Sequence, residues 1–248
     1  WRETGISRSG HGDFIEVEGD LRHIAFLAAR PYGPRDCANL GRETFLLPVE
    51  WTCDGWPLVN GGRGVSWECP YPPLPEESSA ERMEDDDFDA PVLAFPWNTC
   101  RNPDPSGLSL AERPGYLRIR GCPYPLSDIR HTNLVARRQE STDFDAETVL
   151  EFDPPDNRAE AGLTCYYDTR NHLTLSVTRS EHGRIARLAV HNTGPGPERT
   201  EIAVDTVEAE HPLPESGPIT LRVEARGQNY RFFAGPADDV LQEMRTID

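Results

Sequence analysis

The stretch Asn39-Leu-Gly-Arg-Glu-Thr-Phe-Leu-Leu-Pro-Val-Glu-Trp-Thr-Cys-Asp-Gly-Trp-Pro-Leu-Val59 decides the fold class of this chain. Its apolar side chains Phe45, Leu47 and Val49 recur at every second position, and this period predicts a β-strand over residues 43–50 with one apolar face. Asp54-Gly55 is a tight-turn signal that leads into a second strand over residues 56–59. An arginine, Arg42, stands at the head of the first strand.

The residues before this stretch extend the same pattern into a sheet. We predict a short strand over 13–17, a turn over 18–20, a return strand over 22–28 and a loop over 30–38. Four strands joined by tight turns have the anatomy of one propeller blade. A single blade cannot bury both of its faces, so this part of the chain is expected to need further blades beside it.

From Phe88 onward, strand signals recur about every ten residues, which is typical of a β-sandwich. In the strongest of them, Phe144, Ala146, Thr148 and Leu150 share one face while acidic residues largely occupy the other. This alternation predicts antiparallel sheets that are packed on one side and solvated on the other. The predicted strands are 116–120, 133–137, 144–152, 162–167, 172–178, 185–190, 200–205, 219–224 and 230–233.

Between the two parts lies a stretch with many prolines and acidic residues, over 69–87. Low hydrophobicity with a charge run predicts a solvated linker. A calcium loop is the alternative, but the run lacks the alternating Asp spacing and the glycine of such loops. The predicted domains are the end of a propeller over 1–75, a linker over 76–86 and a sandwich over 87–248, the last of them truncated in one interpretation.

Composition narrows the partners and the compartment. The 248 residues carry a formal charge of −17, which argues against nucleic acid or an anionic membrane as a partner because both need a basic face. No stretch has the length of a transmembrane helix, and the start at Trp1 predicts a fragment of a longer protein or a removed signal segment. The six cysteines lack CxxC spacing, so free thiols are favoured, with disulfides as the alternative in a secreted protein. An intracellular location is weakly favoured.

Two residues are candidates for ligand binding. His11 lies between two glycines, which let the backbone approach a ligand or another strand closely. It could line a sugar pocket or bind a metal ion through a ring nitrogen, or it could be a hydrogen-bonded structural histidine. Arg42 offers a planar fork of donors suited to sugar hydroxyls or a carboxylate, and its alternative role is an ion pair with a neighbouring acidic residue such as Glu43.

Other side chains with suitable chemistry carry less information. Trp51, Trp56 and Tyr32 could stack on sugar faces, although aromatic residues beside a turn more often belong to a core. Glycoside hydrolysis generally uses two carboxyl groups on opposite sides of the scissile bond. The carboxylates Asp13, Glu16 and Glu43 have no context that separates an acid from a base, so none is assigned a catalytic role.

Two sets of motifs resemble the family 43 glycoside hydrolases of the β-xylosidase type. The blocks that begin Ser9-Gly-His-Gly-Asp13 and Gly41-Arg-Glu-Thr44 resemble the end of the five-bladed propeller of that family. Arg113-Pro-Gly-Tyr-Leu-Arg-Ile-Arg120 and Glu160-Ala-Gly-Leu-Thr-Cys-Tyr-Tyr167 resemble its appended concanavalin-like sandwich. The resemblance covers nearly the whole chain. It implies an all-β fold: a remnant of a five-bladed β-propeller followed by a concanavalin A-like two-sheet β-sandwich (jelly roll).

The resemblance also implies roles for single residues. His11 matches the histidine on the floor of the active-site funnel, which in some members holds calcium or another divalent cation, although no cofactor is required. Arg42 matches the arginine that binds substrate beside the catalytic base. The Asp and Glu residues of the inverting mechanism belong to earlier blades, so no catalytic residue is expected here. An aromatic residue of the sandwich, Tyr230, Phe232 or Phe233, is expected to shorten the pocket.

These implications lead to one main hypothesis and one rival. The chain is expected to be the carboxyl-terminal part of an exo-acting β-xylosidase or α-L-arabinofuranosidase and to be inactive alone. Its substrates would be xylo-oligosaccharides or arabinoxylan, and the full-length enzyme would be a homo-oligomer. The rival is a non-catalytic carbohydrate-binding or structural sandwich module, since fold alone does not decide function. A binding module would not need the blade-like block at Arg42.

Overall fold

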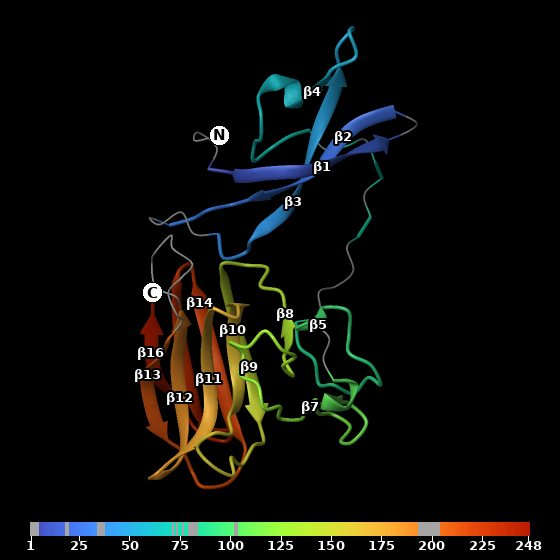
Figure 1. Ribbon diagram of the computed structural model, residues 1–248. Helices are drawn as coiled ribbons and strands as arrows, with labels where there is room; N and C mark the ends of the chain where they lie inside the picture. Colours follow the sequence, from blue (N-terminus) through green and yellow to red (C-terminus); the bar gives the residue numbers. More distant parts are fainter. Residues whose placement is uncertain are drawn as a thin grey trace. The chain divides into compact units, whose positions relative to one another are not determined.

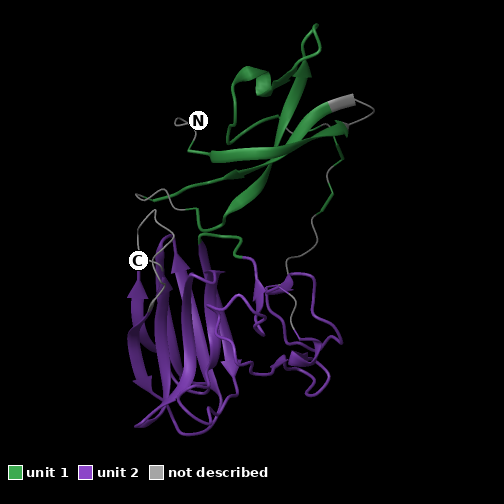
Figure 2. Ribbon diagram, viewed as in Figure 1, with its two compact units in different colours: residues 1–82, 139–142 green, residues 83–138, 143–248 purple. Residues whose placement is uncertain are grey.

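The computed structural model describes residues 5–17, 20–33, 38–70, 72, 74–75, 77–78, 84–101, 104–192 and 204–248. These residues form two compact units. Unit 1 contains residues 1–82 and 139–142, and unit 2 contains residues 83–138 and 143–248 (Figure 2). The predicted boundaries at 75/76 and 86/87 stay predictions, because six of the residues in the expected linker (76 and 79–83) lie outside the described ones.

Unit 1 is one antiparallel sheet in the order β1-β2-β3-β4 (Figure 1). Its strands are β1 (Ser7–Val17), β2 (Asp20–Ala29), β3 (Arg42–Trp51) and β4 (Pro57–Val59), and a short 3-10 helix, η1 (Asn60–Gly62), follows. The predicted turn between β3 and β4 is present. The backbone N–H of Thr52 donates to the Trp56 carbonyl oxygen at 2.9 Å, and that of Gly55 donates to the Thr52 carbonyl oxygen at 2.9 Å. The predicted four-stranded meander is therefore confirmed.

The two faces of this sheet differ in burial. The register pairs Phe26 with Phe45 and Ala28 with Glu43, and cross-strand partners point to the same face. On that face Phe26 and Leu47 pack with Ile6 and Ala28 into a small core. Large apolar side chains outside this core stay exposed, among them Phe14 at 42% and Leu46 at 36%.

Unit 2 is built from two four-stranded antiparallel sheets and two short strand pairs. One sheet has the order β10-β11-β12-β13, the other β16-β15-β14-β9, and the short pairs are β5-β8 and β6-β7. The strands of the first sheet are β10 (Ala161–Asp168), β11 (Asn171–Ser180), β12 (Gly183–Asn192) and β13 (Val204–Pro212). The strands of the second sheet are β9 (Asp143–Leu150), β14 (Ile219–Arg226), β15 (Asn229–Pro236) and β16 (Gln242–Ile247). The short strands are β5 (Trp97–Thr99), β6 (Leu108–Ser109), β7 (Arg118–Ile119) and β8 (Val135–Arg137), and a 3-10 turn, η2 (Pro105–Gly107), precedes β6.

Alternating apolar side chains from both sheets make the core of unit 2. Leu175 and Val177 of β11 and Ile219 and Leu221 of β14 are fully buried in one cluster. The alternation predicted for β9 is also present, with even-numbered positions half-buried and odd-numbered ones exposed. The all-β prediction and the two-sheet sandwich are therefore confirmed. Among the residues that the structure describes, no helix is long and apolar enough to cross a membrane.

Two predictions about strands need correction. No strand was predicted after residue 233, yet β16 pairs with β15. Its residues are mostly exposed except Met244, so this edge strand has no period-two pattern to detect. The strand expected over 200–205 is β13, which runs over Val204–Pro212, while residues 200–203 lie outside the described part of the chain.

Candidate functional site

His11 lies in an irregular part of β1. The register jumps from Gly10 opposite Leu27 to Asp13 opposite Ala25, which marks a β-bulge. His11 takes the bulged conformation with a φ of 50° and is exposed. Its neighbour Gly12 explains the motif in part, because a Cβ there would lie 2.8 Å from the Cδ1 atom of Ile24. The glycine therefore allows β1 and β2 to approach, and the bulge turns His11 outward.

Arg42 is the first residue of β3 and is held there by a turn. Gly41 has a φ of 73°, a conformation that favours glycine, and its N–H donates to Ala38 O at 2.8 Å. Arg42 pairs in register with Ala29, the last residue of β2. Because neighbouring strand residues point to opposite faces, Arg42 projects away from the apolar face to which Glu43 belongs.

The carboxylate of Glu43 pairs with Arg30, a residue that sequence reasoning did not single out. Arg30 donates from Nε to Glu43 Oε2 at 2.7 Å and from Nη2 to Oε1 at 2.5 Å. This two-bonded pair raises the pKa of Arg30, chiefly through the hydrogen bonds to Glu43, which outweigh the opposing effect of burial. Glu43 thus serves a different arginine from the neighbour, Arg42, proposed as its partner.

The aromatic candidates separate into two groups. Trp51 lies against Phe14, with 5.4 Å between ring centroids, and Trp56 is 71% exposed on the β3–β4 turn. Tyr32 instead lines a pocket of about 340 Å³ together with Trp67. Trp67 was not predicted, and its only sequence signal is a tryptophan within a Gly- and Ser-containing segment after β4.

The described residues contain no group of three or more His, Cys, Asp or Glu side chains arranged to hold a metal ion. Asp13 and Glu16 are exposed on β1. A divalent cation at His11 stays a prediction, as does the absence of a catalytic acid or base. The ligand-binding roles of His11 and Arg42 are likewise predictions that the structure places in space without testing.

The aromatic residues predicted to reach a pocket from the sandwich lie on different faces of β15. Tyr230 and Phe232 belong to the buried core of unit 2, with exposures of 8% and 1%. Phe233 lies outside that core, and the guanidinium of Arg231 is 5.0 Å from the centre of its ring. Of the three, Phe233 is therefore the one whose side chain is not used for core packing.

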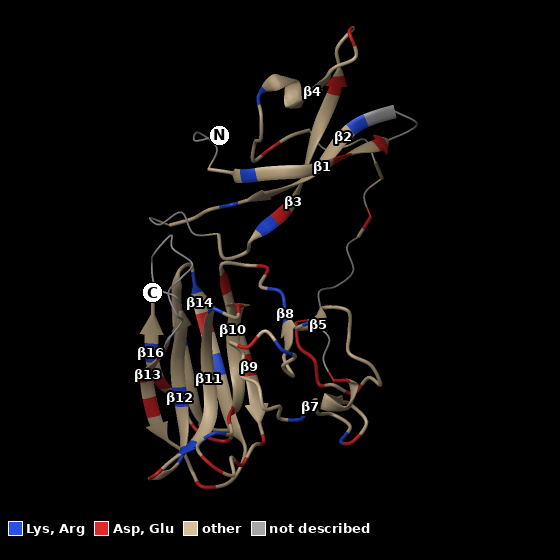
Figure 3. Ribbon diagram, viewed as in Figure 1, with Lys and Arg blue, Asp and Glu red and all other residues tan. Residues whose placement is uncertain are grey.

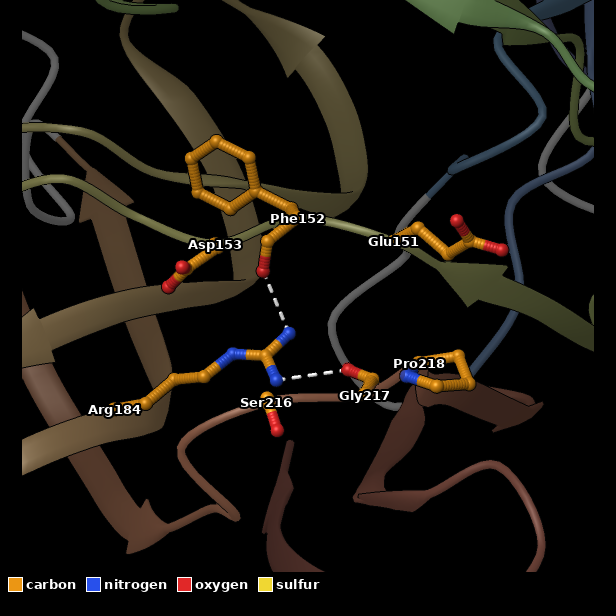
Figure 4. Close-up of a pocket in the computed structure, with 7 residues that line it drawn as sticks. All are labelled: Glu151, Phe152, Asp153, Arg184, Ser216, Gly217 and Pro218. Carbon is orange, nitrogen blue, oxygen red and sulfur yellow. Dashed lines mark hydrogen bonds between the residues drawn. The ribbon is translucent and has the colours of Figure 1, made fainter. Parts of the chain in front are cut away.

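A second pocket, in unit 2, is organised around a buried cation (Figure 4). Its volume is about 280 Å³. Arg184 of β12 is only 2% exposed and donates to the carbonyl oxygens of Phe152 at 2.6 Å and Gly217 at 2.8 Å. Burial lowers the pKa of Arg184, against the opposing field of Asp153. The arginine joins the segment after β9 to the one before β14, which is a structural role.

Basic and acidic positions are interspersed along the ribbon of both units (Figure 3). Many of them pair locally, as Arg113 does with Glu151 and Arg158 with Asp156.

Together these observations define a class of protein. A four-stranded meander with an arginine at the head of its third strand precedes a sandwich of two four-stranded sheets, so the chain combines a propeller-type sheet with a lectin-like sandwich. Residues 85–246 match the model of the beta xylosidase C-terminal concanavalin A-like domain, and residues 1–57 match the model of glycosyl hydrolases family 43. The chain belongs to glycosyl hydrolase family 43.

Relatives with known names support this assignment over nearly the full chain. A non-reducing end alpha-L-arabinofuranosidase of Bacteroides ovatus is 32% identical over 223 residues, which cover 90% of this chain and 40% of the relative. A beta-xylosidase of Bacillus subtilis is 35% identical over 203 residues, or 77% of this chain and 38% of the relative. The chain thus spans less than half the length of these curated relatives.

A solved structure supports the fold. The xylan beta-1,4-xylosidase of Bacillus halodurans C-125 is 34% identical and aligns with a TM-score of 0.88, covering 99% of this chain and 46% of that one. The predicted family and the predicted propeller-plus-sandwich fold are therefore confirmed.

Proposed function

We propose that this chain is the carboxyl-terminal part of a glycosidase that releases a terminal xylose or arabinofuranose residue from xylan-derived oligosaccharides. Its family membership carries the proposal, because both parts of the chain match family 43 models in the order expected. Relatives named for β-xylosidase and α-L-arabinofuranosidase activities favour a pentose as the residue released. In this proposal the catalytic acid and base come from blades that precede this chain.

Arg42 is the residue proposed to bind the substrate. The turn that ends at Gly41 fixes the start of β3, and the side chain is exposed on the face opposite Glu43. A guanidinium cannot lose its proton at physiological pH and offers five N–H donors, so it can hold sugar hydroxyls and keep a nearby catalytic aspartate ionised. His11, turned outward by the bulge in β1, is proposed to line the same pocket.

Exposed apolar side chains of unit 1 favour this proposal over the rival of a free-standing binding module. Phe14, Ile15 and Leu46 are each more than a third exposed, which is costly for a sheet in isolation. Further propeller blades would cover such side chains, whereas a sandwich-only module has no use for them.

The test measures nitrophenol release from aryl β-xyloside and aryl α-L-arabinofuranoside. The 248-residue chain alone is expected to be inactive, and the chain joined to the preceding propeller blades of the B. subtilis relative is expected to be active. Arg42→Ala in that joined protein should lower kcat/KM by about 100-fold or more, as loss of a substrate-positioning contact does. Arg63→Ala, a second exposed arginine of unit 1, is the matched control and should leave kcat/KM nearly unchanged.

Two outcomes would overturn the proposal. Activity of the isolated chain that disappears with Arg42→Ala would place the acid and base within it, among Asp13, Glu16 and Glu43. A joined protein that folds and is active but is indifferent to Arg42→Ala would remove Arg42 from the binding site.

A further inference from the structure

The pocket of about 340 Å³ in unit 1 has the size and lining of a small-molecule site. Ligand pockets commonly measure about 300–1,000 Å³, so this one suits one or two sugar rings. Its walls come from the segment after β2, the turn before β3, the segment after η1 and residues 139–142, all of which belong to unit 1 (Figure 2). The lining residues are Arg30, Pro31, Tyr32, Leu40, Trp67, Glu140, Ser141 and Thr142.

A fixed hydrogen-bond donor stands at this pocket. The Arg30 guanidinium uses Nε and Nη2 for Glu43, and no hydrogen bond from its Nη1 group to another described residue is present. With the side chain still 39% exposed, the two N–H bonds of Nη1 can reach a ligand. Because Glu43 already holds the plane of the guanidinium, little side-chain entropy would be lost on binding.

Aromatic and apolar surface completes the pocket. Trp67 is 57% exposed and lies outside the small core of unit 1, so core packing does not account for it. Tyr32, Pro31 and Leu40 line the same cavity. A sugar ring presents C–H groups on one face and hydroxyls at its edge, which matches an indole face beside a guanidinium.

The charges decide which ligands are excluded. Arg30 is the one basic residue of the lining, and Glu43 neutralises it. The lining therefore offers no excess of positive charge, in a chain whose formal charge is −17. Phosphates and uronic acids find no unneutralised cation among the lining residues, while a neutral, hydroxyl-rich ligand needs none.

We propose that this pocket is a second sugar-binding subsite, which takes a neutral pentose residue of a xylan chain by stacking on Trp67 and by hydrogen bonds from Arg30. The choice of xylan as the ligand rests on the proposed function. Arg30 follows the last residue of β2 and Arg42 is the first residue of β3, so both lie at the same end of this sheet.

The test measures binding of xylotetraose to the 248-residue chain by isothermal titration calorimetry. Trp67→Ala is expected to weaken binding at least tenfold and Arg30→Ala to weaken it measurably, while Trp67→Phe keeps most of the affinity because it keeps an aromatic face. Trp56→Ala removes another exposed tryptophan of the same unit and should leave binding unchanged. Circular dichroism melts of each variant confirm that folding is retained, and tetragalacturonic acid should not bind.

Arg42→Ala separates this inference from the proposed function. If the pocket is a subsite of its own, part of the xylotetraose affinity survives Arg42→Ala and is lost when Trp67→Ala is added. If Arg42→Ala abolishes binding and Trp67→Ala does not change it, the subsite is refuted while the role of Arg42 stands. Absence of xylotetraose binding to the folded wild-type chain also refutes the subsite, and leaves the hydrolysis test of the proposed function untouched.

Discussion

The imidazole rings of His172 and His191 stack on neighbouring strands of unit 2, with 4.6 Å between centroids and 17° between planes. They belong to a row that crosses the whole β10–β13 sheet, because the register aligns Tyr166, His172, His191 and Asp205. Both imidazoles are largely buried, at 9% and 7% exposure. His191 Nδ1 and Asp205 Oδ1 are 2.5 Å apart, and His172 Nδ1 donates to the Asp168 carbonyl at 3.2 Å.

The stack predicts that unit 2 loses stability in mild acid. Burial, more than any other effect, lowers the pKa of His172 below its ordinary value, and the neighbouring His191 acts in the same direction against the favourable Asp168 and Asp205. Below about pH 6.5, the ordinary histidine pKa, the unfolded chain therefore binds more protons than the folded one. The free energy of unfolding should fall as the pH decreases from that value towards the lower folded-state pKa.

Urea unfolding at pH 7.5, 6.5 and 5.5 checks this expectation. His172→Asn keeps a donor for the Asp168 carbonyl but cannot titrate, so its stability should depend less steeply on pH over this interval. Equal pH dependence in the wild type and the variant would show that His172 is not the responsible group.

Arg184 predicts a large loss of stability on substitution. Arg184→Met keeps the length of the side chain but leaves the carbonyl oxygens of Phe152 and Gly217 without their donor. Buried acceptors that lose their partner cost about 1–3 kcal/mol each, so the variant should unfold about 2–5 kcal/mol more easily. Arg187→Met on the same strand removes only a surface pair with Glu210 and should cost less than about 1 kcal/mol. Chemical denaturation of both variants decides between these values.

Sequence patterns were sufficient to locate a strand where one of its faces is buried. The alternation of Phe45, Leu47 and Val49 located β3, and that of Phe144 to Leu150 located β9, because burial on one side imposes a period of two. The motif around Arg42 likewise placed that residue at the start of its strand. These features are local, and each can be recognised within about ten residues of sequence.

Contacts between distant segments could not be predicted in the same way. The Arg30–Glu43 pair joins residues 13 positions apart, and Arg184 meets carbonyls more than 30 positions away. From the sequence alone, Glu43 was considered as an ion-pair partner of Arg42 because the two residues are adjacent in the chain. The edge strand β16 was missed because most of its side chains are exposed, so no alternation of apolar and polar residues marks it in the sequence.

The cysteines are predicted to differ in reactivity. The five described cysteines are all unpaired, and Cys37 lies outside the described residues. Cys53 and Cys69 are exposed, while Cys165 packs against the core of unit 2, and burial raises the pKa of its thiol to about 12. Since the thiolate is the reactive form, iodoacetamide at pH 8 should label Cys53 and Cys69 in the native chain and spare Cys165.

Peptide mass spectrometry before and after unfolding in urea measures this difference. Cys165 should become labelled only in the unfolded sample, which also serves as the control for reagent access. Labelling of Cys165 in the native chain at the rate of Cys53 would contradict the packing described for β10.

Gly162 is predicted to be intolerant of any side chain. It lies opposite Ser176 in the β10–β11 register, and a Cβ at this position would meet the carbonyl oxygen of Leu175 at 2.1 Å and Ser176 Cα at 2.7 Å. Both obstacles are backbone atoms, so β10 must shift away from β11, and such overpacking costs about 1–3 kcal/mol. Gly121→Ala is the matched control, since a Cβ there meets nothing within 4 Å. Thermal melts should show a clear decrease in Tm for Gly162→Ala and almost none for Gly121→Ala; equal melting temperatures would mean that the two strands are not packed this closely.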